Sequence, residues 1–105
     1  MAWVMLFVAG LLEIVWAYSM KLSQGFTQPA ASTVTFVAMF ASFALLSASM
    51  KTLPLGTAYT VWTGIGAVGA FIVGIVALGE SMSAVRVLAA ALIVSGLVLM
   101  KMATP

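Results

Sequence analysis

The chain has 105 residues, of which 65% are hydrophobic and only 6% are charged. A soluble domain carries about a quarter charged residues, so the composition predicts a small integral membrane protein. There is no histidine and no cysteine, which excludes the usual metal ligands, thiol nucleophiles and disulfides. An enzyme is therefore the least favoured class, and no metal or cofactor is expected. The net charge of +2 does not imply nucleic-acid binding, because contacts with anionic lipid headgroups explain it.

Four stretches are long and apolar enough to cross a bilayer, which takes about 20 helical residues. No basic signal-peptide region precedes the first stretch, so we expect it to stay in the mature protein. The connecting segments are short and contain turn residues such as Gly25, Pro29 and Pro54. The sequence predicts an all-α membrane protein with one transmembrane domain over residues 1–105. Its four spans are expected at about 2–20, 31–50, 55–78 and 84–102.

The basic residues are divided equally between the two ends of such a bundle. Lys51 and Lys101 fall on the side of the N-terminus, and Lys21 and Arg86 fall on the other side. Since the bias in Lys and Arg sets the orientation of a membrane protein, this count favours insertion in both orientations. The alternative is that the amino terminus or one headgroup contact selects a single orientation. Dual insertion permits an antiparallel homodimer, which recreates the inverted repeat of larger transporters.

Small residues that permit close helix contacts are found in the third and fourth spans. The fourth span contains no acidic and no aromatic residue, so its expected role is contact between subunits. The small residues are Gly66, Ala70 and Gly74 in the third span, and Ala89, Ser95 and Gly96 in the fourth.

Glu13 is the only acidic residue within a predicted span. An ionised carboxylate near the bilayer centre costs roughly 2.5 kcal/mol or more, so it marks a functional site by default. With a rise of 1.5 Å per residue, Glu13 lies about 15 Å from the membrane surface on the N-terminal side, Ser42 about 13 Å and Trp62 about 11 Å. All three are near the middle of a hydrocarbon core about 30 Å thick. They predict one polar layer formed by three helices.

Helical spacing adds aromatic and thioether side chains to this layer. Tryptophan usually lies at the membrane interface, but Trp16 and Trp62 are too deep for it; ordinary helix packing is the alternative. Ser42, Tyr59 and Trp62 can donate hydrogen bonds to Glu13 and hold its rotamer. The side chains added by spacing from Glu13, Ser42 and Trp62 are Trp16, Met39, Phe43 and Tyr59.

A carboxylate among aromatic rings suits a guanidinium ion, which forms two parallel hydrogen bonds with it and stacks on the rings. Burial disfavours the charged form of a carboxyl group, whereas hydrogen-bond donors favour it. If these effects balance, Glu13 can hold either a proton or a cation, which is what an exchanger requires. In a dimer the two Glu13 side chains would titrate as a coupled pair.

Glycines lie beside this layer in two of the spans. Gly64 and Gly66 follow Trp62 in the run WTGIGAVGAF, and paired glycines weaken a helix interior. They predict a hinge, with a static kink or a close contact as the alternative. Gly10 precedes Glu13 by about one turn and permits helices to cross closely beside the site.

The remaining charges are expected to lie outside the polar layer. Glu80 and Arg86 fall in the third loop region, where we expect a solvated pair. The lysines lie at the ends of spans and can extend to the headgroups. No catalytic role is expected for any of them.

The chain resembles the small multidrug resistance family over essentially its whole length, and more closely its guanidinium-exporter subtype. The position of Trp16 three residues after Glu13, and WTGIGA in the third span, are typical of that subtype rather than of the quaternary-ammonium exporters. The matching stretches are AGLLEIVWAYSMKLSQGF, MKTLPLGTAYTVWTGIGAVGA and LIVSGLVLMK.

The resemblance implies an antiparallel, dual-topology homodimer in the bacterial inner membrane that exports guanidinium-type cations in exchange for protons. It implies that Glu13 is the shared site for substrate and proton. The residues implied to line this site are Trp16, Ser42, Tyr59 and Trp62, with Met39 and Phe43 at a side portal toward lipid.

At the dimer contact, relatives often have two glycines seven residues apart in the fourth span. Here Ala89 takes the first place and Gly96 keeps the second. The expected consequence is slightly looser packing.

Other functions stay open at the level of sequence. A quaternary-ammonium multidrug/proton antiporter of the same fold is the first alternative. A cation channel or uniporter is the second, since the same layer could pass cations without proton exchange. A non-transporting assembly subunit is the third, although it leaves the deep carboxylate of Glu13 unexplained.

Overall fold

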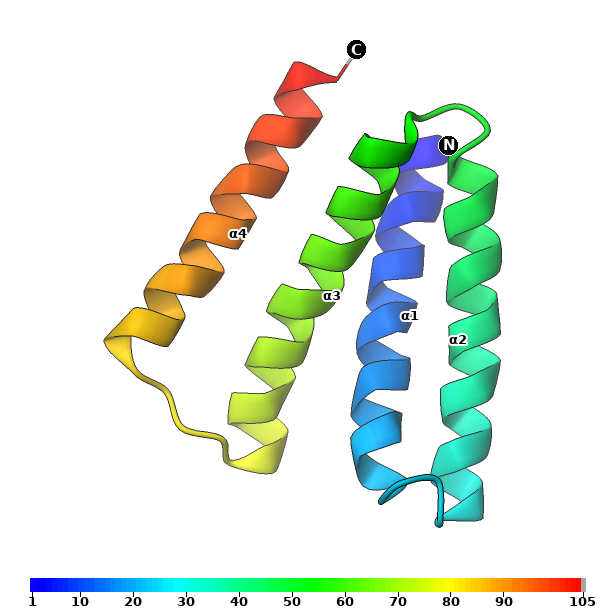
Figure 1. Ribbon diagram of the computed structural model, residues 1–105, viewed down its shortest axis with the longest axis vertical. Helices are drawn as coiled ribbons and strands as arrows, with labels where there is room; N and C mark the ends of the chain where they lie inside the picture. Colours follow the sequence, from blue (N-terminus) through cyan, green and yellow to red (C-terminus); the bar gives the residue numbers. More distant parts are fainter. Residues whose placement is uncertain (105) are drawn as a thin grey trace.

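The computed structural model describes residues 1–104; Pro105, the last residue of the predicted domain, lies outside the described residues. Each of four helices has the length and apolar composition needed to cross a membrane, which confirms the prediction of four spanning helices. They begin and end within two residues of the predicted spans. The helices are α1 (Ala2–Leu22), α2 (Pro29–Ser49), α3 (Leu55–Leu78) and α4 (Ala84–Ala103) (Figure 1).

Local chemistry explains several of the helix ends. α2 starts with Pro29 at its first position, where a missing N–H costs nothing and the fixed φ suits a helix. α3 ends at Gly79, which has a left-handed φ of 69°, and the Glu80 N–H donates to the Gly74 carbonyl at 3.0 Å. This closure is the usual glycine C-cap. At the start of α4, the hydroxyl of Ser83 accepts a hydrogen bond from the Arg86 N–H at 3.2 Å.

The four helices form a flat subunit measuring 43 × 34 × 16 Å between its Cα atoms. α1 packs most extensively against α2 and also against α3, whereas the backbone of α4 lies close to α3 alone among the described helices. One side chain of α4 reaches α1, because Lys101 Nζ lies 4.6 Å from the centroid of the Trp3 ring. Figure 1 shows α4 at one edge of the subunit, with α3 between it and the other helices. No residue of α4 is buried. The helix that the sequence assigns to subunit contact is thus the one least covered by its own chain.

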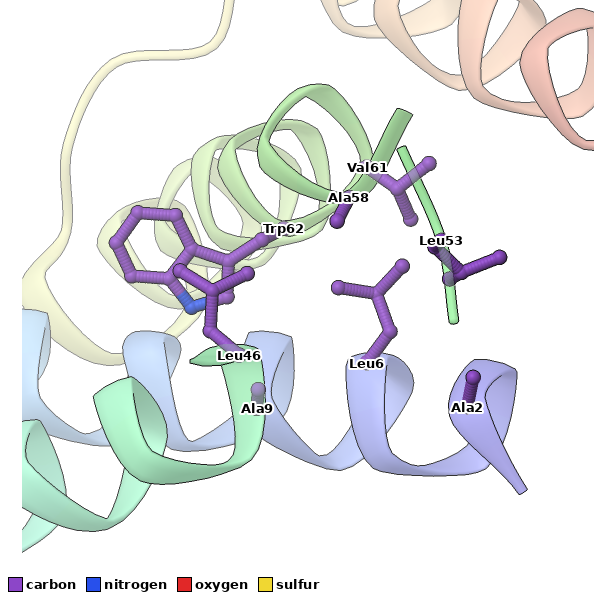
Figure 2. Packing of buried hydrophobic residues seen from close by; sticks show 8 residues of the cluster. All are labelled: Ala2, Leu6, Ala9, Leu46, Leu53, Ala58, Val61 and Trp62. Atoms are coloured by element: carbon purple, nitrogen blue, oxygen red, sulfur yellow. The ribbon is translucent and has the colours of Figure 1, made fainter. Parts of the chain in front are cut away.

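The buried apolar core lies between α1, α2 and the first turns of α3. Leu6 and Ala58 are fully buried within it. Figure 2 shows Trp62 at one end of this cluster and Ala2 at the other. The core thus ends at a residue of the predicted polar layer. Its members are Ala2, Leu6, Ala9, Leu46, Leu53, Ala58, Val61 and Trp62.

Candidate functional site

Glu13 lies where α1 crosses the glycine-rich part of α3. A Cβ atom added at Gly66 would collide with the Glu13 carboxylate, so the carboxylate occupies the space that the glycine leaves. Glu13 Oε1 is buried and has no hydrogen-bond partner among the described residues. A buried polar atom without a partner costs about 1–3 kcal/mol. The site therefore holds a strong acceptor that the subunit itself does not satisfy.

Trp16 presents an unpaired donor close by in the sequence. It is three residues after Glu13 on α1, and its indole Nε1 is also buried without a partner among the described residues. Its ring meets the Phe43 ring of α2 edge-on, with the centroids 6.3 Å apart and the planes at 73°. Residues three apart share one helix face, so an unpaired acceptor and an unpaired donor lie on the same face of α1.

Ser42 connects three helices through its hydroxyl group. Its Oγ donates to the carbonyl oxygen of Ala9 on α1 at 2.7 Å and accepts a hydrogen bond from Trp62 Nε1 of α3 at 2.9 Å. Ser42 is fully buried, and Trp62 is only 6% exposed. The common depth of Ser42 and Trp62 was predicted. The predicted hydrogen bonds from these two residues to Glu13 are not found, because the Ser42 hydroxyl donates to the Ala9 carbonyl and the Trp62 indole N–H donates to Ser42 Oγ.

The aromatic side chains of the predicted layer form a continuous series across α1, α2 and α3. Phe43 lies between Trp16 and Trp62, with its ring centroid 5.8 Å from that of Trp62. Tyr59 lies 5.6 Å from Trp62 and is 53% exposed. These spacings are within the range of favourable aromatic pairs. The series gives the site several ring faces, which can attract a cation.

The two residues predicted for a side portal lie on α2. Phe43 is 43% exposed while it also contacts the two tryptophan rings. Met39 is half-buried, one turn earlier in the same helix. Phe43 thus reaches both the ring series and the surface of the subunit. The portal role itself stays a prediction.

Gly10 and Gly64 are close-packing positions in this structure. A Cβ atom at Gly10 would come within 3 Å of Ile65, and one at Gly64 would come within 3.0 Å of Leu97. α3 is a continuous helix through Gly64 and Gly66. Close contact therefore accounts for these glycines in the present conformation, and hinge motion stays a prediction.

The positions predicted for dimer contact lie on the open side of α4. Ala89 and Gly96 are both exposed, and nothing lies within 4 Å of a Cβ atom built at Gly96. Gly96 also lines a groove of about 480 Å³ between α3 and α4, together with Tyr59 and Met100. The subunit itself does not fill this groove.

Two contributors to these sites were not identified from the sequence. The Ala9 carbonyl accepts the Ser42 hydroxyl, and a backbone acceptor has no sequence signal. Phe71 of α3 lies under the guanidinium of Arg86, with Cζ 5.3 Å from the ring centroid. The sequence predicted a solvated pair of Glu80 and Arg86 but not this contact with Phe71. Within residues 1–104, no three His, Cys, Asp or Glu side chains lie close enough to hold a metal ion.

Fold and site together define a small multi-pass membrane protein with a carboxylate set between two of its helices. Comparison with known proteins is consistent with this class. Residues 1–93 match the profile of the family described as Small Multidrug Resistance protein. The chain belongs to the small multidrug resistance family and is a multi-pass protein of the bacterial inner membrane.

Curated relatives resemble the chain over nearly its full length. Proteins named Guanidinium exporter from Citrobacter freundii and Salmonella typhimurium are 55% identical over 104 residues, which cover 99% of this chain and 99% of each relative. A protein of the same name from Yersinia pestis is 55% identical over 104 residues, which cover 99% of this chain and 100% of the relative.

Proposed function

We propose that this protein exports guanidinium and small substituted guanidinium cations in exchange for protons, and that its four helices act as one transmembrane domain. The observation that carries the proposal is the Glu13 carboxylate, buried against Gly66 with one oxygen unpaired. Relatives named Guanidinium exporter, at 55% identity, support the choice of substrate.

The chemistry of the site favours a flat cation. A guanidinium ion presents paired N–H donors that match the two oxygens of a carboxylate, and its planar face stacks on aromatic rings. The ring series runs from Trp16, which shares a helix face with Glu13, through Phe43 to Trp62, and it offers such faces. The Trp16 N–H has no partner among the described residues; it can donate to a carboxylate but not to the cation, because guanidinium has no acceptor atoms.

Exchange with protons follows from the single charge of Glu13. A protonated carboxyl group no longer attracts a cation, and a carboxylate paired with guanidinium no longer accepts a proton. Loading one therefore releases the other. With alternating access to the two sides of the membrane, an inward proton gradient drives the cation outward.

We further infer that the working unit is an antiparallel homodimer formed by subunits inserted in both orientations. Three features support it: the equal division of basic residues between the two ends of the bundle, the uncovered α4 and the open space at Gly96. A symmetric dimer is the smallest closed assembly. It would bring two Glu13 side chains to one cavity as a coupled pair.

The decisive experiment measures guanidinium flux in liposomes under an imposed proton gradient. We expect Glu13→Gln to abolish proton-driven flux, because the amide keeps the size of the side chain but can neither release a proton nor pair with a cation. Glu13→Asp is the matched control and should retain slower, coupled flux. Full coupled transport by Glu13→Gln would contradict the mechanism. Flux that ignores the pH gradient and persists in this variant would identify a channel or uniporter.

A broader specificity for quaternary-ammonium cations is the second candidate. The observation that favours it is the groove of about 480 Å³ beside Tyr59, since an apolar surface can receive bulky alkyl groups. Competition decides between the two: an exporter selective for guanidinium should show little inhibition of flux by tetraphenylphosphonium or tetraethylammonium.

A further inference from the structure

A second cavity leads away from the Glu13 site toward one end of the bundle. It has a volume of about 330 Å³ and lies between the carboxyl-terminal halves of α1 and α3. Ala17 and Ala70 line its inner part. Ala17 is four residues after Glu13, and Ala70 is four residues after Gly66, so each is about 6 Å farther along its helix. Ala67, which directly follows Gly66, also lines the cavity, so the cavity begins within one turn of the contact between Glu13 and Gly66.

The outer end of this cavity holds a bound guanidinium group, that of Arg86. Its Nη2 lies 3.9 Å from Glu80 Oε1, and its Cζ lies 5.3 Å from the centroid of the Phe71 ring. Its Nη1 donates to the Ser81 carbonyl at 2.7 Å. The side chains of Arg86 and Glu80 are 41% and 44% exposed. A carboxylate and an aromatic face therefore hold a guanidinium group where solutes can reach it.

The position of Glu80 is set by the end of α3. Gly79 turns the chain in the left-handed conformation, and the Glu80 N–H closes the helix on the Gly74 carbonyl. Gly74 lacks a side chain, and a Cβ atom there would collide with the Glu80 carboxylate. The carboxylate consequently lies against the backbone of α3, on the wall of the cavity.

We propose that Glu80 and Phe71 form a peripheral binding site for guanidinium ions, which a transported cation occupies by displacing the guanidinium group of Arg86. The inference rests on the proposed function and adds a place where the substrate binds before or after Glu13. Both sites combine a carboxylate with an aromatic side chain: Trp16 shares the helix face of Glu13, and Phe71 lines the same cavity as Glu80. At 3.9 Å, the pair of Glu80 and Arg86 is longer than a hydrogen bond, and exposed pairs contribute little to stability. Glu80 therefore holds Arg86 weakly, and an incoming cation can replace Arg86 at Glu80 while Arg86 keeps its bond to the Ser81 carbonyl.

Guanidinium flux in liposomes, fitted for KM and kcat, tests the proposal. Glu80→Gln and Phe71→Leu should raise KM about two- to fivefold, the contribution of one exposed ion pair or cation–π contact. Arg86→Gln should lower KM by a similar factor, because the internal competitor is lost. The value of kcat should stay close to that of the native chain, since Glu13 is intact.

Two comparisons exclude simpler explanations. If Glu80 and Arg86 only stabilised the loop, Glu80→Gln and Arg86→Gln would shift KM in the same direction. If only local charge mattered, Phe71→Leu and Arg86→Lys would leave KM unchanged. In that case Lys21→Gln would also lower KM by as much as Arg86→Gln does. Either pattern would overturn the peripheral site.

Failure of the peripheral site and failure of the proposed function give different results. If only the peripheral site is wrong, the native chain still shows proton-coupled flux and Glu13→Gln still loses it. If the proposed function is wrong, the native chain and Glu13→Gln no longer differ in proton-coupled flux. Elution of each variant as a single species in detergent checks that it is folded, and the exposed pair of Glu80 and Arg86 makes unfolding of those variants unexpected.

Discussion

Ser42 is the residue that fixes the relative positions of α1, α2 and α3 near Glu13. Its hydroxyl donates to Ala9 and accepts from Trp62, and the residue is fully buried. Hydrogen bonds between membrane helices contribute about 0.6 kcal/mol on average. A buried donor left without any partner costs more, about 1–3 kcal/mol.

We therefore expect Ser42→Ala to destabilise the protein by about 1–2 kcal/mol, because the Trp62 indole N–H would lose its partner. The Ala9 carbonyl would lose only the bond that it accepts in addition to its bond within α1. The measurement is reversible unfolding by sodium dodecyl sulfate in a mild detergent. Ser47→Ala is the matched control, since Ser47 is exposed on the same helix, and it should unfold like the native chain. Equal stability of the two variants would refute the structural role of the Ser42 hydroxyl.

Depth along a helix could be predicted from the sequence, whereas rotation and backbone partners could not. Counting the rise per residue placed Ser42 and Trp62 at one level, and they are hydrogen-bonded. The same count says nothing about which way a hydroxyl points. The acceptor in Ala9 is a backbone carbonyl, which every residue has. The expected hydrogen bond from Ser42 to Glu13 was therefore wrong for a reason that counting residues along a helix cannot detect.

At the scale of elements, glycines set the distance between α1 and α3. The side chain of one helix fills the space at a glycine of the other in three places, so the helix backbones approach closely, as small residues permit in membranes. Glu13 is one of these side chains, which ties the binding carboxylate to the packing of two helices. The three contacts are Gly10 with Ile65, Gly66 with Glu13, and Gly69 with Ile14.

Gly66→Ala should reduce guanidinium flux on the order of ten- to a hundredfold, because the added Cβ must displace the Glu13 carboxylate and small misplacements of a reacting group have effects of this size. Flux in liposomes at equal protein content is the measurement. The control is Gly56→Ala on the same helix, where nothing lies within 4 Å of the added atom. Native flux in Gly66→Ala would show that the carboxylate need not lie against α3.

The helices themselves were the most predictable feature. Each span is a long apolar run bounded by turn residues, so its bounds follow from length and composition. The two-residue shift at the start of α2 reflects Pro29, which fits the first turn of a helix as well as it fits a loop. Hydropathy did not reveal that the backbone of α4 lies close to α3 alone, because a side that faces lipid and a side that faces another helix are equally apolar.

At the scale of the whole molecule, α4 is the least covered of the four helices, as the proposed dimer requires. The subunit is only 16 Å across its shortest dimension, and the groove between α3 and α4 reaches Tyr59 of the aromatic series. A second subunit that packs on α4 would close this groove and the site from the other side. The open space at Gly96 lies where close contact of two copies is expected.

Gly96→Leu tests this assembly, since nothing lies within 4 Å of a Cβ atom built at Gly96 and the groove beside it leaves room for a longer side chain. Overpacking of a close contact costs about 1–3 kcal/mol, which weakens dimerisation about tenfold or more. Energy transfer between subunits labelled with donor and acceptor dyes, measured over a dilution series in detergent, reports the loss. Ala91→Leu is the control, because Ala91 is an equally small, exposed residue on the opposite side of α4. Unchanged association of Gly96→Leu, or equal weakening by both variants, would place the subunit contact elsewhere.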